Sequence, residues 1–230
     1  MTKVLVALDA PNAAQAFWIV ESLQETGLPF GVKVGMELAC AEGHTLIQEL
    51  SKRGIYVFDD QKRIDIKNTL TQTAKVQLAY GAKMANCMCG SGPAGIRAFA
   101  DACRERNVTS IGVTVLTTKD DAECDKEFGR TALEQVEFYA RWAQDNGLDG
   151  VVCSPLELPV IKKKFKLLAV CPGIRPKWAA PNDQKRITTP TKAVRMGADF
   201  LVIGRPITST EYGTPGENLV KVYEEIELAA

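Results

Sequence analysis

The sequence contains a single histidine, His44, and this scarcity excludes several kinds of site. A His-rich metal site needs several imidazoles, and a Ser-His-Asp triad needs one in a suitable position. His44 lies within a helical pattern, and we interpret it as a surface residue. The spacing of Cys87-Met88-Cys89 is not that of a zinc site. Since no pyridoxal or thiamine signature is present either, we expect neither a metal nor another cofactor.

The chain also lacks an apolar run of membrane-spanning length and an excess of charge of either sign. Its 28 Lys and Arg residues balance 28 Asp and Glu residues. The basic run at 162–166 is isolated, so we interpret it as the solvated end of a helix and expect no nucleic-acid partner. The seven cysteines are odd in number and lie mostly in apolar segments, which favours reduced thiols over a disulfide framework. We therefore expect a cytoplasmic protein without a membrane partner.

Short β-rich runs alternate with longer amphipathic stretches eight times along the 230 residues. The predicted strands span residues 4–8, 30–34, 55–60, 84–88, 110–116, 150–153, 167–171 and 200–203. The predicted helices span residues 13–26, 45–53, 66–79, 95–106, 133–146, 158–164 and 219–225.

This alternation, in a chain of this length, is typical of a (β/α)8 TIM barrel in the α/β class. No linker-like segment divides the chain, so we expect residues 1–230 to form a single barrel domain. A doubly wound open sheet is the alternative architecture.

Charged residues gather at the carboxyl ends of two predicted strands. Asp60 and Lys62 lie two residues apart and therefore share a strand face, and Asp65 follows where a helix begins. Lys33 lies near the end of another short apolar run. Because α/β enzymes carry their chemistry at this edge, the four alternating charges are candidates for one active site. A solvated charge cluster is the alternative interpretation.

The loops after the seventh and eighth predicted strands have the composition of a phosphate site, which such barrels often form there. Gly204 lets the backbone approach an anion closely, and Arg205 offers a planar set of donors to phosphate oxygens. Gln184 lies in the long polar segment 177–189 that precedes the last strand. Together these residues predict binding of a phosphorylated ligand.

One further motif has a simpler explanation. The segment Gly90-Ser91-Gly92-Pro93-Ala94-Gly95 fits the dinucleotide pattern G-x-G-x-x-G. That pattern also requires an acid after the next strand, and the predicted strand is followed by Thr117. We interpret the glycines as a tight turn, with Pro93 at the first helical position, and expect no nicotinamide site.

The chain carries seven motifs in a defined order. They are Ala7-Leu8-Asp9, Lys33-Val34-Gly35, Asp60-x-Lys62-x-x-Asp65-Ile66-x-x-Thr69, Val113-Thr114-Val115-Leu116-Thr117, Pro172-Gly173-Ile174-Arg175-Pro176, Asp183-Gln184-Lys185-Arg186 and Ile203-Gly204-Arg205-Pro206-Ile207. Together they resemble the orotidine 5'-phosphate decarboxylase family. Sister enzymes that act on pentulose and hexulose phosphates share the Asp-x-Lys-x-x-Asp core, whereas the Pro-Gly-Ile-Arg and Asp-Gln-Lys-Arg motifs are more specific to the orotidylate enzyme.

The resemblance implies a cofactor-free lyase that converts orotidine 5'-monophosphate to uridine 5'-monophosphate, the last step of de novo pyrimidine nucleotide biosynthesis. It implies that Lys62 is the proton donor to C6, within an Asp-Lys-Asp-Lys network formed with Lys33, Asp60 and Asp65. It further implies a homodimer in which Asp65 and Thr69 cross into the neighbouring site. The implied substrate-binding residues are Asp9, Lys33, Asp60, Thr69, Thr118, Pro172, Arg175, Gln184, Gly204 and Arg205.

The chain departs from the family pattern at Arg63-Ile64, where an aromatic-His pair is usual, and at Lys67, where proline is usual. It also has Cys171 where threonine is common and Asn182 where glycine is common. Three rival functions stay open. One is a magnesium-dependent sister enzyme, with Asp59 as a stand-in for its additional acid. The others are a Schiff-base aldolase or isomerase and a catalytically silent phosphate binder.

Overall fold

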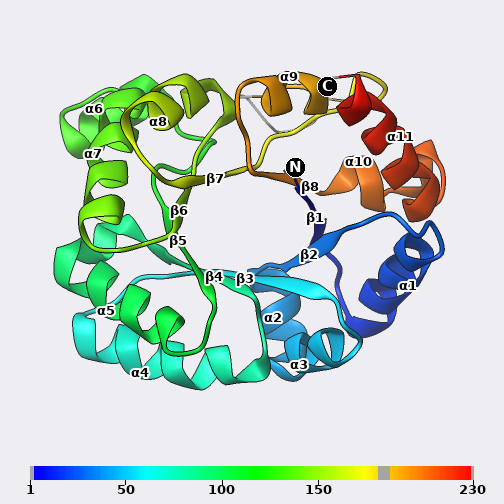
Figure 1. Ribbon diagram of the computed structural model, residues 1–230, viewed down its shortest axis with the longest axis horizontal. Coiled ribbons are helices and arrows are strands. Elements are labelled where there is room, and N and C mark those ends of the chain that lie inside the picture. Colours follow the sequence, from blue (N-terminus) through cyan, green and yellow to red (C-terminus); the bar gives the residue numbers. More distant parts are fainter. Residues whose placement is uncertain (1–2, 181–186, 229–230) are drawn as a thin grey trace.

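Eight parallel strands close into a barrel in the computed structural model, which describes residues 3–180 and 187–228 (Figure 1). Each strand pairs with the next, and β8 pairs with β1 through partners such as Leu201 and Val4. This closure confirms the predicted TIM barrel and excludes the open sheet. The strands are β1 (Lys3–Leu8), β2 (Gly31–Val34), β3 (Tyr56–Arg63), β4 (Met84–Met88), β5 (Thr109–Val113), β6 (Gly150–Val152), β7 (Leu168–Cys171) and β8 (Phe200–Ile203).

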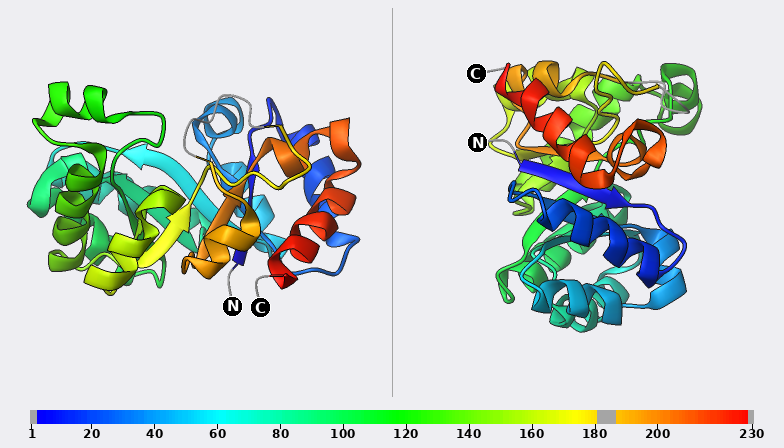
Figure 2. Two further views of the ribbon diagram at one scale, coloured as in Figure 1. Left: turned by 90° about the horizontal axis from the view of Figure 1, so that it is seen from above. Right: turned by 90° about the vertical axis from the view of Figure 1, so that its right-hand side faces the viewer.

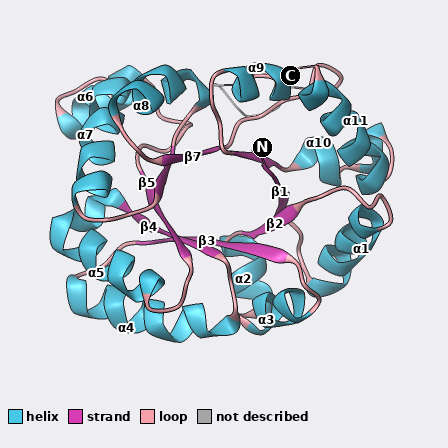
Figure 3. Cartoon of the chain, viewed as in Figure 1, coloured by secondary structure: helices cyan, strands magenta, loops and turns pink. Residues whose placement is uncertain are grey.

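Helices surround the strands on the outside of the barrel (Figure 3). In Figure 2, β1 (dark blue) and the last helix (red) run in opposite directions, so this helix returns the chain. Because each strand pairs in parallel with its neighbours, all strands point to the same end of the barrel. The helices are α1 (Ala13–Gln24), α2 (Met36–Glu42), α3 (Thr45–Lys52), α4 (Lys67–Gln77), α5 (Gly92–Arg104), α6 (Asp121–Phe128), α7 (Ala132–Asp145), α8 (Leu158–Lys164), α9 (Pro190–Arg195), α10 (Arg205–Thr208) and α11 (Pro215–Glu227).

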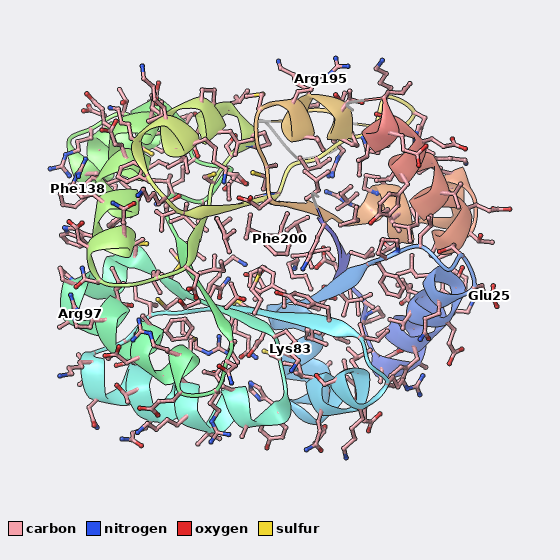
Figure 4. All side chains as sticks on the ribbon, in the orientation of Figure 1. Glu25, Lys83, Arg97, Phe138, Arg195 and Phe200 are labelled. Carbon is pink, nitrogen blue, oxygen red and sulfur yellow. The ribbon has the colours of Figure 1, made fainter. Side chains whose placement is uncertain are left out.

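The strands are apolar along most of their length because both faces of the barrel wall are buried. A larger hydrophobic cluster fills the space between the strands and the helices, with Leu50 and Phe99 fully buried in it. Figure 4 shows Phe200 inside the ring of strands and Glu25 at the perimeter. A smaller cluster fills the barrel itself and forms a solid support beneath its carboxyl end. Its buried members are Leu5, Ala7, Phe58, Met84, Ile111, Val170, Phe200 and Val202.

Three strands end at other residues than the sequence predicts, and β6 differs only by ending at Val152 instead of Cys153. The differences in β3 and β5 affect the charged end of the barrel. β3 continues to Arg63 because the chain pairs with β4 again, at Arg63 and Cys87, after an irregular stretch. Lys62 therefore belongs to the strand. β5 already ends at Val113, and the Thr114 hydroxyl then donates a hydrogen bond to the Val152 carbonyl at 2.8 Å.

The sequence patterns did not predict the short helices α2, α6, α9 and α10. The start of α6 carries a capping box between Asp120 and Glu123, and α9 begins with Thr189 followed by Pro190. These local signals are readable in the sequence. The apolar periodicity is nevertheless weak because such short helices bury little. Cys124 is the buried residue of α6.

His44 is not a surface residue within a helix, as its sequence context suggested. It stands at the N-cap of α3 and is half-buried. Its Nε2 atom lies 2.8 Å from the Gln61 Nε2 atom, and its ring centroid lies 5.4 Å from that of Tyr80. The surface prediction was only partly right, because Gln61 of β3 and Tyr80, both distant in sequence, contact the imidazole ring.

The cysteines and the basic run agree with their predicted environments. All seven cysteines are free thiols, and six of them are buried. The basic run forms the end of α8, although Lys162 is paired with Asp199 at 2.5 Å instead of being fully solvated. Among the residues that the structure describes, no helix combines the length and the apolar character needed to cross a membrane.

Candidate active site

A cavity of about 250 Å³ lies at the carboxyl end of the barrel, where enzymes of this architecture carry their chemistry. Its floor is apolar and comes from the inward-facing side chains of the strands. Its walls are charged, with an acid-base cluster beside β1 to β3 and two arginines beside β7 and β8. The lining residues are Ala7, Asp9, Lys33, Phe58, Asp60, Lys62, Val113, Val115, Leu116, Thr117, Val152, Val170, Pro172, Gly173, Arg175, Val202, Gly204 and Arg205.

Asp60 binds two lysines at once in the acid-base cluster. The Lys62 Nζ atom lies 2.9 and 3.0 Å from the two carboxylate oxygens of Asp60. The Lys33 Nζ atom lies 3.3 Å from Asp60 Oδ2 and 3.3 Å from Asp9 Oδ1. Lys33 belongs to β2, Asp60 and Lys62 belong to β3, and Asp9 directly follows β1. The barrel thus brings four of the predicted charged residues together.

The two lysines differ in their access to a ligand. The side chain of Lys62 is 35% exposed, whereas that of Lys33 is 12% exposed. Burial disfavours the charged form of Lys33, but Coulomb attraction to Asp60 and Asp9 and hydrogen bonds to both outweigh this effect. The pKa of Lys33 is therefore raised above its usual 10.5. Lys33 is a fixed internal cation, and Lys62 is the ammonium group that a bound ligand can reach.

Asn86 orients the acid of the cluster and was not among the residues predicted from the sequence. Asn86 is fully buried on β4. Its Nδ2 atom donates a hydrogen bond to Asp60 Oδ1 at 2.6 Å, and its Oδ1 atom accepts one from the Lys62 backbone N–H at 2.8 Å. The one signal in the sequence was a polar amide within an otherwise apolar run, because a buried amide must find partners.

The opposite wall of the cavity is suited to an anion. Arg175 is 7% exposed, and its Nη1 atom donates to the Ile174 carbonyl at 3.1 Å. Its pKa is lowered, first by burial and then by the charge of Arg205, so two guanidinium groups lie near each other here. A Cβ atom on Gly204 would lie 3.3 Å from Asp9 Oδ2. The absence of a side chain therefore leaves space between Gly204 and Asp9 at the cavity wall. Pro172 also lines this wall.

Several predicted site residues lie outside the cavity wall. Asp65 and Thr69 are exposed, and Asp65 Oδ1 accepts a hydrogen bond from the Ile66 backbone N–H at 2.7 Å. Thr118 is exposed in the turn after β5, and its neighbour Thr117 lines the cavity in its place. Lys67 is exposed at the first position of α4 and is not part of the described lining. Gln184 lies outside the described residues.

Asp59 does not offer an acid to the cavity. It is fully buried, forms an ion pair with Arg63 and accepts a hydrogen bond from Gln61 Nε2 at 2.9 Å. It is not among the described residues that line the cavity. Within residues 3–180 and 187–228, no three His, Cys, Asp or Glu side chains are grouped as metal ligands would be.

Known proteins resemble the chain over almost its whole length. The model of the Orotidine 5'-phosphate decarboxylase / HUMPS family matches residues 2–219. The orotidine 5'-phosphate decarboxylase of Paramagnetospirillum magneticum is 38% identical, with 98% of each chain covered. That of Dichelobacter nodosus is 40% identical, over 89% of this chain and 91% of the relative. Among solved structures, the crystal structure of orotidine 5'-phosphate decarboxylase from Lactobacillus acidophilus superimposes with a TM-score of 0.84 at 31% identity, covering 98% of this chain and 99% of that chain.

The relatives share one name, that of an enzyme of the carboxy-lyase class, and the solved structure among them shares the barrel. The chain belongs to the orotidine 5'-phosphate decarboxylase / HUMPS family.

Proposed function

We propose that the protein decarboxylates orotidine 5'-monophosphate to uridine 5'-monophosphate without a cofactor. One observation carries this proposal: a preformed cluster of Lys33, Asp60 and Lys62 faces a cavity whose opposite wall presents Arg175 and Arg205. A nucleotide with a charged reacting centre at one end and a phosphate at the other matches a cavity with an acid-base cluster on one wall and two arginines on the opposite wall. The relatives named above support the choice of substrate.

The reaction needs electrostatic stabilisation more than covalent chemistry. When the bond between C6 and the carboxylate breaks, CO2 leaves and the electron pair stays on C6. No carbonyl group of the ring is placed to delocalise this carbanion. The Lys62 ammonium group stabilises the developing charge and then transfers a proton to C6, which yields the product and a neutral amine that solvent reprotonates.

Asp60 and Lys33 prepare Lys62 for this step. Asp60 holds the ammonium group through both carboxylate oxygens, and Lys33 balances the negative charge of Asp60 from the other side. The charges are in place before substrate binds, so little reorganisation is needed during the reaction. Asp9 and Lys33 are also suitably placed at the cavity wall to meet the ribose hydroxyls.

The phosphate binds on the wall formed after β7 and β8. Arg205 and the Gly204 backbone meet the phosphate oxygens, and Arg175 lines the same cavity. The resemblance adds Gln184, outside the described residues, as a further ligand. Binding energy from the phosphate, remote from C6, positions the pyrimidine ring over Lys62.

The active form is a homodimer with composite sites. Asp65 and Thr69 are exposed in the single chain and adjoin apolar side chains that are also exposed. Ile64 and Ile66, which flank Asp65 in the sequence, are 62% and 72% exposed, and Val76 on α4 is 63% exposed. Large apolar side chains exposed in this way support an interface with a second copy. A second copy that covers these residues brings its Asp65 and Thr69 to the neighbouring cavity.

The burial of Asp59 separates this proposal from the magnesium-dependent sister enzymes. Asp59, the possible stand-in for the additional acid of those enzymes, is paired with Arg63 and is not among the described residues that line the cavity. Both lysines of the cluster are paired with carboxylates, which opposes the neutral amine that a Schiff-base enzyme needs.

The proposal is tested by following the loss of orotidine 5'-monophosphate absorbance in metal-free buffer with EDTA. We expect rapid turnover by the wild type. The variant Lys62→Ala should lose a factor of about 10⁴ or more in kcat, because it removes both the general acid and the charge stabilisation, while still binding the product. Activity that appears only with a sugar phosphate and magnesium would move the protein to the sister enzymes.

A further inference from the structure

β3 departs from regular pairing with β4 at the residues that form the acid-base cluster. Asp59 pairs with Ala85 and Arg63 pairs with Cys87, so the three residues 60–62 stand opposite Asn86 alone. This irregularity is a β-bulge, a device that redirects a side chain out of the regular alternation of a strand. Lys62 adopts a φ of +48° within it. The left-handed conformation is strained for a lysine and persists only where surrounding contacts hold it.

Asn86 replaces the missing strand partner of the bulge. Its side chain accepts the Lys62 backbone N–H at 2.8 Å and donates to Asp60 Oδ1 at 2.6 Å. One buried amide therefore bonds the backbone of Lys62 and the carboxylate that holds the Lys62 ammonium group. It couples the strained backbone to the position of the charged end.

An ion pair between Arg63 and Asp59 links the two sides of the bulge. It joins the last regular residue before the bulge to the first regular residue after it. Arg63 also donates from Nη1 to the Asn86 carbonyl at 3.1 Å and from Nε to Gln77 Oε1. Arg63 is 7% exposed and Asp59 is fully buried. All three nitrogens of the guanidinium group are thus engaged away from the cavity.

The placement of this pair is informative because a buried ion pair is a poor stabiliser. The desolvation of two charges offsets much of their attraction, and an apolar pair of similar volume is often as stable or more stable. A buried pair is therefore better explained by the geometry that it imposes. Here that geometry is the distance between Asp59 and Arg63 on the two sides of the bulge. A charge-assisted ion pair fixes this distance more narrowly than a single hydrogen bond or apolar packing does.

We propose that Arg63, Asp59 and Asn86 are positioning residues that hold the β-bulge, and thereby hold Lys62 in its left-handed conformation on Asp60. None of the three is among the described residues that line the cavity, so they act on the reaction through the cavity residues Lys62 and Asp60. This inference rests on the proposed function, since Lys62 is the residue that transfers the proton.

The test compares a double variant with a single-residue control. In Asp59→Leu/Arg63→Met the ion pair becomes an apolar pair, so the barrel should keep its stability. In the control Lys162→Met, the ion pair with Asp199 is lost at the other end of the barrel. We expect the double variant to lose about 10- to 100-fold in kcat with KM within threefold, because small displacements of a reacting group have effects of this size. We expect Lys162→Met to keep the wild-type kcat.

Two results would overturn the proposal. One is a wild-type kcat in the folded double variant, and the other is a kcat of the double variant that falls only in proportion to its loss of stability. Asn86→Ala provides a second measurement if the double variant does not fold, with the same expected loss in kcat.

A crystal structure of the double variant separates this proposal from the proposed function. It should show Lys62 outside the left-handed region or its Nζ atom more than 4 Å from Asp60. If the wild type lacks decarboxylase activity, this structural result still decides the role of the ion pair. An unchanged Lys62 would refute it.

Discussion

Lys33 and Asp60, on the neighbouring strands β2 and β3, form an ion pair with 3.3 Å between Nζ and Oδ2 at the wall of the cavity. Asp60 also holds Lys62, so the removal of Lys33 changes the charge balance around the reacting group without removing that group. The pair lies where the carboxyl ends of two parallel strands meet.

Because the pKa of Lys33 is raised, the stability of the fold should decrease at alkaline pH. A pKa raised on folding adds stability that is complete below the unfolded value, 10.5, and is lost as the pH rises through the folded value. The difference in unfolding free energy between wild type and Lys33→Met should therefore be constant from pH 7 to about 10 and should shrink above 10.5. Urea unfolding at each pH measures this difference in unfolding free energy. The variant Lys52→Met, which removes an exposed lysine, is the control for the change in net charge. A difference that grows over the alkaline range would contradict the assignment.

Arg205→Ala should discriminate between phosphorylated and unphosphorylated substrate. Loss of charge-assisted hydrogen bonds should lower kcat/KM for orotidine 5'-monophosphate about 10- to 100-fold. The value for orotidine, which has no phosphate, should change less than about twofold. Initial rates with both compounds measure the effect, and Arg195→Ala on α9 is the control for losing a cation elsewhere. Equal losses for both substrates would remove Arg205 from the phosphate site.

Mixed dimers test the composite site. Lys62→Ala and Asp65→Asn each impair a site, but a dimer with one subunit of each kind contains one site with both native residues. Random mixing of equal amounts should therefore recover about a quarter of the wild-type activity. Activity after joint refolding or coexpression measures this, with each variant alone as reference. If the mixture stays as inactive as the separate variants, Asp65 acts within its own subunit.

Lys67→Pro should stabilise the protein without changing its activity. Lys67 is the first residue of α4, where the backbone N–H has no acceptor within the helix. The preceding Ile66 has φ −64° and ψ 156°, a conformation that a following proline favours. The gain should be about 0.4–1 kcal/mol in unfolding free energy, chiefly by restricting the unfolded chain. Chemical denaturation measures it, and a loss of stability would show that the lysine N–H is needed.

The barrel was readable from the sequence because its causes are local. Each strand is a short apolar run, each long helix is an amphipathic stretch, and the order of the two leaves few architectures open. Lys33, Asp60 and Lys62 were predicted for the same reason. The carboxyl ends of parallel strands must meet, so charges that close successive strands are brought together whatever the details of packing.

The tertiary structure alone decided the contacts that cross between elements. The bulge in β3 depends on its register with β4, and neither the place of Asn86 beneath Asp60 nor the pairing of Asp59 with Arg63 follows from a local pattern. The exposure of Asp65 likewise depends on how the chain turns into α4. Sequence periodicity reports which residues are buried, whereas register and side-chain partners arise only when distant segments pack. The sequence by itself therefore determined the barrel and the charges at its mouth, and the packing of β3 against β4 decided how Lys62 is held.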